Sequence, residues 1–394
     1  MTKQSQYYML RHLINEKDFS FIALVLTFFL LPLSINLSSI AFVVAVVLKI
    51  YQSTLLQFKL FYSESVRQSS FFALCFFCYI IANSIIQNDI QYTVAEFDRQ
   101  FLHYAVLFIA PMLLREYSFN KLLIISLSYG LTIAIGYVLF ICIITNTKFD
   151  QFTTQYYLDL HHTYLSLFLL FITNQLMAFV TEKGMKFNWL TAISIATFFF
   201  ITFWLLYSVN SKVSVLVFVF LVIFYLAPKL SKKTAVKYGF VFLILALSIY
   251  MFISKLEQSY IDAFEYRTQI WEAAIEAIKQ KPFFGNLQDS EKNVINFQHY
   301  MSGKYYFLDS NLNSHNQYLS ITLKFGIIGL IIFFIYLFHC CKSLYKKKSS
   351  NQRLFTGFLL IMFTIFIIEN ILVRHHGIVL FAFGINYFLI SKNE

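Results

Sequence analysis

Charged side chains are scarce in this chain. Asp, Glu, Lys and Arg make up 13% of its 394 residues, whereas 58% are hydrophobic and 20% are aromatic. Apolar runs recur along the sequence, and they are long enough to cross a bilayer, which takes roughly 20 residues per helix. The shortage of charge and the repeated apolar runs predict a polytopic membrane protein.

The short alternating segments of a transmembrane barrel are also missing. Only helices and closed barrels satisfy their backbone hydrogen bonds in lipid, and continuous apolar runs favour helices. We therefore predict an all-α, polytopic transmembrane helix bundle of about 12 spans, forming a single membrane domain over residues 1–394. The expected spans are approximately residues 19–34, 38–51, 70–86, 101–114, 122–145, 163–181, 189–207, 213–228, 238–254, a tenth ending near 341, 354–372 and 376–391.

Cysteine pairs and processing signals are equally sparse. All five cysteines lie within or at the ends of apolar runs, and none lies in a long polar stretch, which argues against a disulfide framework. Cys75 and Cys78 are more consistent with helix packing than with a metal or redox pair. The apolar run from Phe19 lacks a small-residue cleavage site and continues through Pro32, so we expect no cleavable signal peptide.

No glycine-rich phosphate loop or nucleotide fingerprint is present. We expect no cofactor, and the energy for any reaction should arrive in an activated substrate rather than as ATP. No His-Glu-x-x-His pattern is present either, and adjacent histidines on a helix rarely chelate one metal together. The sequence therefore disfavours a catalytic metal.

The net charge of +11 comes from basic residues scattered in short loops between the apolar runs. This distribution is typical of a topology signal rather than of a nucleic-acid surface. Alternate loops sort so that the basic ones share the side of the N-terminus, which the positive-inside rule assigns to the cytoplasm. We expect both termini to be cytoplasmic and the loop 255–316 to lie outside.

That loop is the one long polar interruption of the chain. Within it, residues 265–281 have the periodicity of an amphipathic helix that Pro282 stops. The predicted apolar stripe contains Ile270, Trp271, Ala274, Ile275 and Ile278. Arg267 falls on this side, and an inward guanidinium needs an anionic partner. Alternatives are a structural salt bridge or snorkelling to the surface.

His315 follows at the end of the loop, where we predict that it opens the tenth helix. A histidine at the outer mouth of a bundle can act as a general base, because its pKa lies near neutrality. It can equally be an interfacial cap. Lys212 lies in an outer turn beside Ser208 and Ser211, which suits phosphate binding by a point charge, although snorkelling is a competing explanation.

Two further outer clusters contain His161 with His162, and Glu369 with Arg374, His375 and His376. We interpret them as the polar lining of an external cavity that contacts substrate, with Glu369 and Arg374 as a candidate pair. Neither cluster has the pattern of a catalytic zinc site.

Several of these residues together resemble the O-antigen ligase and polymerase superfamily of bacterial membrane glycosyltransferases. The matching residues are Arg267, Trp271, Pro282, Gly285, His315, Asn316, Leu319, Gly326 and Gly329, set around a large loop. The family's Arg-x-x-x-Leu motif is met by Lys212 and Leu216, with Lys in place of Arg. The resemblance extends over approximately residues 205–335.

The resemblance implies a bundle of the GT-C type and a donor in which undecaprenyl diphosphate carries a glycan. Arg267 and Lys212 would bind the diphosphate, with Asn316, Arg374, His161 and His162 as further substrate contacts. His315 would take the proton from an acceptor hydroxyl, which displaces the lipid diphosphate with inversion and without a metal. The protein would be multi-pass in the bacterial inner membrane, with a periplasmic active site.

The resemblance leaves the acceptor open. A ligase transfers the glycan to lipid A–core, a polymerase extends a glycan held on a second carrier, and a protein O-oligosaccharyltransferase modifies a polypeptide. The single large loop favours the ligase. A lipid-linked sugar transporter is an alternative of another class, but the sequence shows neither a polar path towards the cytoplasm nor inverted repeats.

Overall fold

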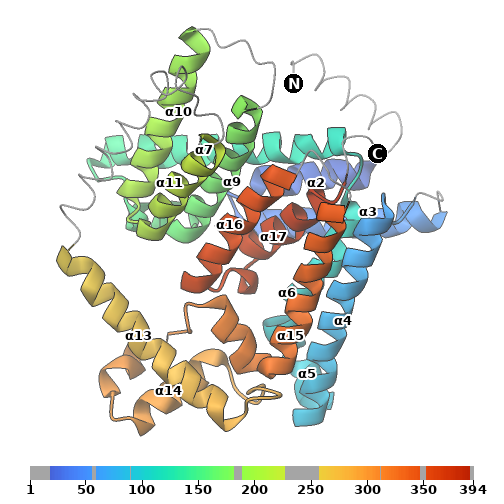
Figure 1. The fold of residues 1–394 in the computed structure, drawn as a ribbon, viewed down its shortest axis with the longest axis vertical. Coiled ribbons are helices and arrows are strands. Elements are labelled where there is room, and N and C mark those ends of the chain that lie inside the picture. The colour runs from blue at the N-terminus through green and yellow to red at the C-terminus, as the bar shows by residue number, and fades with distance from the viewer. Residues whose placement is uncertain are drawn as a thin grey trace. The chain divides into compact units, whose positions relative to one another are not determined.

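The computed structural model describes residues 18–55, 59–88, 90–181, 189–226, 257–310, 312–346 and 352–390. Within these ranges the chain is helical and contains no strand (Figure 1). The all-α class predicted from the sequence is thus confirmed for the described residues. The predicted span 238–254 and the basic residues 229–237 lie outside the described ranges.

The chain divides into two compact units. The first unit comprises Met1–Phe168, Ile328–Phe358 and Ile371–Glu394, and the second comprises Leu169–Ile327 and Leu359–Asn370. Helices α9 (His162–Thr181), α15 (Gln317–Lys346) and α16 (Gln352–Ile368) each contribute residues to both units.

The first unit is built mainly from apolar helices. Besides its parts of α9, α15 and α16, it contains α2 (Phe19–Leu30), α3 (Ile35–Leu55), α4 (Glu64–Gln87), α5 (Ile90–Ala95), η1 (Phe97–Phe101), α6 (Leu102–Ile109), η2 (Ala110–Leu113), α7 (Tyr117–Thr145), α8 (Gln151–Leu158), η5 (Ile371–Val373) and α17 (His375–Tyr387). The second unit adds α10 (Trp189–Ser208), α11 (Lys212–Leu226), α13 (Glu257–Gln280), α14 (Glu291–Met301) and η4 (Tyr305–Ser310).

Five of the described helices, α3, α4, α7, α9 and α15, are long and apolar enough to cross a membrane. Five shorter apolar helices accompany them, including α2, α11 and α16. Their positions follow the predicted spans closely, because continuous apolar runs marked both. The number of 12 spans and the GT-C type of bundle remain predictions.

The tenth predicted span contains a break at Gly326. This residue has φ +69° and ψ −179° inside α15, so its backbone leaves the helical conformation there. The loop that follows α13 packs against the break: the Ile327 amide donates to the Pro282 carbonyl at 2.8 Å, and the Asn286 amide donates to the Leu323 carbonyl at 2.7 Å. The break frees groups of α15 to hydrogen-bond with another segment of backbone.

Glycine is required on both sides of this contact. A Cβ at Gly326 would lie 2.0 Å from the carbonyl oxygen of Phe283, and one at Gly285, which has φ +76°, would lie 2.4 Å from the carbonyl oxygen of Lys324. The loop after α13 therefore packs directly against the backbone of α15 at Gly326.

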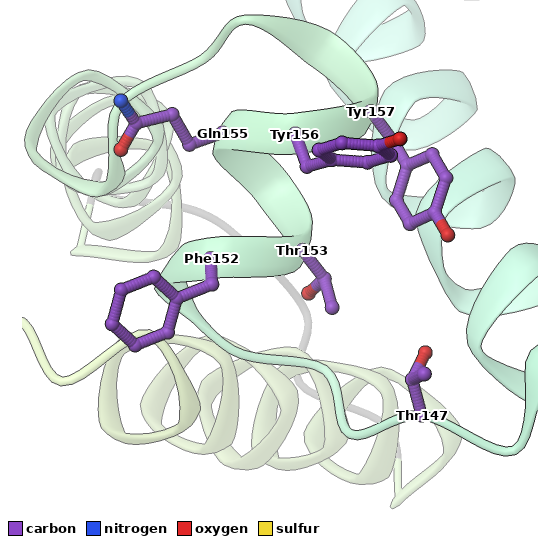
Figure 2. Close-up of a pocket in the computed structure, with 6 residues that line it drawn as sticks. All are labelled: Thr147, Phe152, Thr153, Gln155, Tyr156 and Tyr157. Carbon is purple, nitrogen blue, oxygen red and sulfur yellow. The ribbon is translucent and has the colours of Figure 1, made fainter.

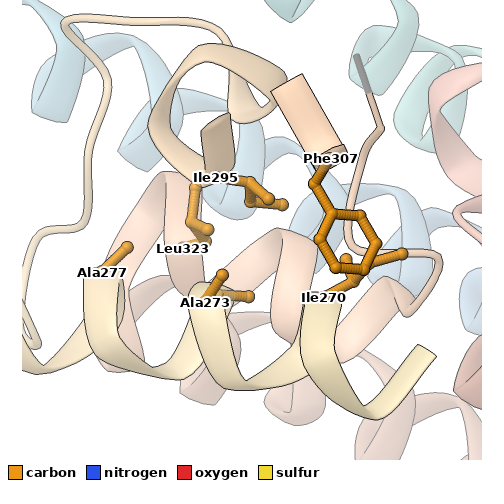
Figure 3. Packing of buried hydrophobic residues seen from close by; sticks show 7 residues of the cluster. Ile270, Ala273, Ala277, Ile295, Phe307 and Leu323 are labelled. Carbon is orange, nitrogen blue, oxygen red and sulfur yellow. The ribbon is translucent and has the colours of Figure 1, made fainter. Parts of the chain in front are cut away.

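The core of the second unit joins α13, α14, η4 and α15. Figure 3 shows Ile270, Ala273 and Ala277 of α13 directed towards Ile295, Phe307 and Leu323. Ile275 was predicted to belong to the apolar stripe, but its side chain is 42% exposed. The buried stripe is rotated towards Ala273 and Ala277, because small residues let α13 pack closely against its neighbours.

His299 is a buried polar member of the same region. Its ring stacks on Phe307 with 4.3 Å between centroids, and it is 1% exposed. Neither of its ring nitrogens has a hydrogen-bond partner among the described residues. Burial lowers the pKa of the imidazole below its ordinary value, and the positive charge of Lys304 adds to this effect. His299 is therefore neutral in the folded protein near neutral pH.

We expect Gly326→Ala to destabilise the protein more than Gly303→Ala. Gly303 also has a positive φ, +73°, but a Cβ there would meet nothing within 4 Å. Its substitution costs only backbone strain, about 1–2 kcal/mol. At Gly326 the same strain is joined by the clash with Phe283. Thermal denaturation of the two purified variants measures the difference, and equal melting temperatures would contradict the packing described for Gly326.

Because the pKa of His299 is lowered in the folded state, we expect the protein to lose stability on mild acidification. The pKa of the unfolded imidazole is about 6.5 and the folded value is lower, so below about pH 6.5 the unfolded state binds more protons. Folding stability then falls as the pH falls, by up to about 1.4 kcal/mol per pH unit. His299→Phe, which retains an aromatic ring, should show a smaller drop in melting temperature between about pH 7.5 and pH 5.5. An equal drop would argue against this role.

Candidate functional site

His315 lies in a turn between the polar loop and α15. Its φ of +45° is in the left-handed region, and its amide donates to the Asn313 side-chain oxygen at 3.1 Å. The sequence predicted that His315 opens the helix, but α15 begins two residues later, at Gln317. Asn316 supplies the cap, because its Oδ1 accepts from the amides of Tyr318 and Leu319 at 3.0 and 3.1 Å.

The His315 ring faces a carboxylate from another part of the chain. Its Nδ1 lies 3.4 Å from Glu369, which immediately follows α16. The side chain of His315 is 29% exposed, whereas that of Glu369 is 12% exposed. A shielded carboxylate beside one ring nitrogen of a more accessible histidine is the arrangement found where a carboxylate orients a general base. The separation is long for a hydrogen bond, as is common in sites without substrate.

The charge of Arg267 also interacts with the charge of Glu369. It is half-buried on α13, one turn before Ile270 and Trp271. Burial lowers the pKa of its guanidinium, and the negative charge of Glu369 acts in the opposite direction. Glu369 is thus an acidic group whose charge acts on the inward Arg267. The sequence suggested Glu369 and Arg374 as a candidate pair, whereas the structure shows Glu369 beside His315.

Trp271 connects α13 to the turn that carries His315. Its indole N–H donates to the carbonyl of Ser314 at 3.0 Å. Burying the indole N–H requires such an acceptor, and here the acceptor is the residue next to His315. Arg267 and His315 are therefore linked through one turn of helix and one hydrogen bond.

A buried acidic residue that sequence reasoning missed lies beneath this turn. Glu291, the first residue of α14, is 5% exposed and accepts hydrogen bonds from Ser314, Ser320 and Asn370. Its Oε2 lies 3.9 Å from the ammonium of Lys324. In the sequence Glu291 is one of several acidic residues of the polar loop, and no local pattern separates it from Glu272 or Glu276, whose side chains are 59% and 58% exposed.

The remaining residue of the predicted phosphate site is Lys212, the first residue of α11. It lies in the second unit, as do Arg267 and His315, and it is half-buried. The turn before it is formed by Asn210, with φ +55°, and its own amide donates to the Asn210 carbonyl at 3.1 Å. Lys212 thus follows a turn, as the sequence predicted, while the outer location of this turn stays a prediction.

Arg374, His161 and His162 lie in the first unit. The guanidinium of Arg374 lies 5.9 Å from the ring centroid of Tyr164, a cation–π arrangement, and the ring of His161 lies 6.4 Å from the same tyrosine. The His161 and His162 rings are 4.1 Å apart between centroids. The structure therefore groups these three residues with Tyr164, while their contact with substrate stays a prediction.

The first unit also contains a pocket of about 620 Å³ (Figure 2). Thr147, Phe152, Thr153, Gln155, Tyr156 and Tyr157 line it. Most of these residues belong to α8, and none of them is among the predicted site residues. Among the described residues no group of three or more His, Cys, Asp or Glu side chains is arranged to hold a metal ion.

Comparison with known proteins gives one finding. Residues 197–334 match the family described as O-antigen ligase, and no curated protein matches the chain significantly. The matched segment contains Lys212, Arg267, Glu291, His315 and Asn316. It coincides closely with the range over which the sequence resembled this superfamily, so the predicted resemblance is confirmed.

Proposed function

We propose that this chain is a membrane glycosyltransferase of the O-antigen ligase or polymerase type, which its match over residues 197–334 supports, and we propose a specific reaction for it. Such a family implies lipid-linked glycan substrates and a location in the bilayer. In the proposed reaction, a glycan moves from undecaprenyl diphosphate to a sugar hydroxyl of lipid A–core, on the periplasmic side of the bacterial inner membrane.

The observation that carries this proposal is the pairing of His315 with Glu369. One ring nitrogen, Nδ1, faces the carboxylate at 3.4 Å, so the other nitrogen, Nε2, is the one left to take a proton. The carboxylate fixes the orientation of the ring and stabilises the imidazolium that forms. His315 is therefore assigned as the general base, and Glu369 as the residue that orients it.

The donor diphosphate is assigned to Arg267 and Lys212. Arg267 has a planar, always charged guanidinium, which can bind phosphate oxygens in a bidentate manner. Partial burial strengthens its interaction with an anion, because the local dielectric is lower than in water. Lys212 adds a point charge from the start of α11, in the position where the family has Arg. Glu369 keeps the charge of Arg267 balanced before the donor arrives.

In the reaction the acceptor O–H bond breaks and its proton passes to His315. The oxygen attacks the anomeric carbon from the face opposite the diphosphate, and the new C–O bond forms as the bond to the carrier breaks. The electron pair of that bond leaves with undecaprenyl diphosphate, whose charge Arg267 and Lys212 stabilise. The product has inverted configuration, and no metal or cofactor takes part.

The other predicted contacts are assigned to substrate binding. We propose that Arg374, His161 and His162, all in the first unit, contact the glycan or the acceptor. Asn316 supports the site by capping α15, which sets the end of the turn that carries His315. An acceptor glycan on a second carrier, or a polypeptide, would place the protein with the polymerases or with the protein O-oligosaccharyltransferases.

We expect purified protein to transfer a defined glycan from polyprenyl diphosphate in the presence of a chelator, and His315→Ala to abolish this transfer while donor binding persists. The assay offers lipid A–core, carrier-linked glycan and a polypeptide as acceptors. Product from the wild type alone supports the base assignment, and the acceptor used identifies the activity. Equal product from both proteins would remove His315 as the base, and binding without transfer to any acceptor would favour a transporter.

Glu369→Gln should lower kcat on the order of 10²-fold without raising the donor KM. The amide retains the size of the side chain but no longer stabilises a protonated His315, and general acid–base catalysis contributes about this much. Donor affinity should be kept, because the variant removes a negative charge near Arg267. Glu272→Gln, at a side chain that is 59% exposed, is the matched control and should be neutral. A raised donor KM with unchanged kcat would contradict the assignment.

A further inference from the structure

We infer that Glu291 is a positioning residue, whose buried carboxylate sets the distance between His315 and Glu369. The inference rests on the proposed function, because it assigns to Glu291 a role through the pair that carries the chemistry. Glu291 contacts neither member of the pair in the hydrogen bonds described above. It holds the residue before His315 and the residue after Glu369.

Glu291 first holds the turn that carries His315. Oε1 of Glu291 accepts from the backbone amide of Ser314 at 2.9 Å and from its hydroxyl at 2.6 Å. Ser314 is fully buried. Two hydrogen bonds from one residue to one carboxylate oxygen fix the backbone and the side chain together. They hold the chain immediately before the left-handed residue His315, whose conformation needs such support.

Glu291 also holds the turn that carries Glu369. The same Oε1 accepts from the Nδ2 of Asn370 at 2.9 Å, and Asn370 is 1% exposed. The backbone amide of Asn370 in turn donates to the Glu369 carboxylate at 3.1 Å. One oxygen atom of Glu291 is therefore shared by the neighbours of both His315 and Glu369, which are 54 residues apart in the sequence.

The other carboxylate oxygen anchors the whole group to α15. Oε2 accepts from the hydroxyl of Ser320 at 2.5 Å and lies 3.9 Å from the Lys324 ammonium. Glu291 is also in the first turn of α14, where the helix dipole favours a negative charge. These interactions compensate for burying an ionised group, whose isolated burial would be prohibitive. The charge is thus stable only while all the partners stay in place.

This geometry makes Glu291 costly to replace even by an isosteric amide. In Glu291→Gln one terminal oxygen remains for Ser314 and Asn370, but an NH₂ group takes the place of Oε2. That group is a donor, and it faces the positive charge of Lys324. The amide therefore satisfies only part of the network, and the relation of the His315 turn to Glu369 loosens. Glu291→Ala removes every one of these bonds.

The first arm of the test does not depend on any activity. Hydrogen–deuterium exchange of the purified full chain is compared for wild type, Glu291→Gln and the control Glu276→Gln, whose side chain is 58% exposed and pairs with Lys279. Exchange in the peptides covering residues 312–319 should rise at least about tenfold in Glu291→Gln and stay unchanged in the control, because exchange follows local opening. Unchanged exchange in both variants would overturn the inference.

The second arm uses the transfer assay. Glu291→Gln should lower kcat at least about tenfold and change the donor KM by less than about twofold. In the Glu369→Gln background, which keeps measurable activity, the same substitution should cause no further loss, because its effect passes through the pair of His315 and Glu369. A further loss of about tenfold in that background would show general destabilisation and overturn the positioning role.

The two arms separate this inference from the proposed function. If the wild type transfers no glycan, the proposed function fails, and the exchange experiment still decides whether Glu291 holds the His315 turn. If the wild type transfers glycan and Glu291→Gln matches it in kcat, the proposed function stands and the inference fails. Faster exchange together with the loss of kcat supports both.

Discussion

The buried carboxylate of Glu291 is the interaction on which the candidate site depends. It joins the start of α14, the turn before α15, the first turn of α15 and the turn after α16 through hydrogen bonds to groups that are almost fully buried. A charge in this position is stable only if every partner is present, and a partner that leaves costs more than an ordinary hydrogen bond. The cost makes the arrangement all-or-none, which suits a site whose reacting groups come from distant parts of the sequence.

Close backbone packing in the described part of the second unit supports this network. Ala273 and Ala277 bring α13 against its neighbours, and the glycines at 285 and 326 let the loop after α13 bond directly to the broken backbone of α15. A break in a transmembrane helix costs free energy if it leaves backbone N–H and C=O groups without hydrogen bonds. Here the carbonyl of Pro282 accepts from the Ile327 amide next to the break, so the irregular backbone is satisfied by protein.

Several elements could be predicted because their signal is local. Continuous apolar runs marked the helices, and Pro282 marked the end of α13, which the structure places at Gln280. Arg267 stood out as a charge on the apolar side of a helix, and Lys212 stood out as a charge in a turn beside Ser208 and Ser211. The start of α15 was misplaced by two residues, because the cap by Asn316 and the positive φ of His315 have no strong signature in an His-Asn-Gln sequence. The orientation of α13 was misjudged at Ile275, since a helical wheel does not show which small residues face a neighbour.

The sequence by itself indicated the helical class, helices long and apolar enough to cross a membrane, the resemblance to the O-antigen ligase family and the residue types available for transfer, because composition, hydrophobic runs and short motifs are properties of the chain. Only the tertiary structure decided which groups meet. It placed Glu369 beside His315, and it buried Glu291 while leaving Glu272 and Glu276 exposed. The physical reason is that the environment of a carboxylate is set by partners 23 to 79 residues away along the chain, and no local pattern carries that information.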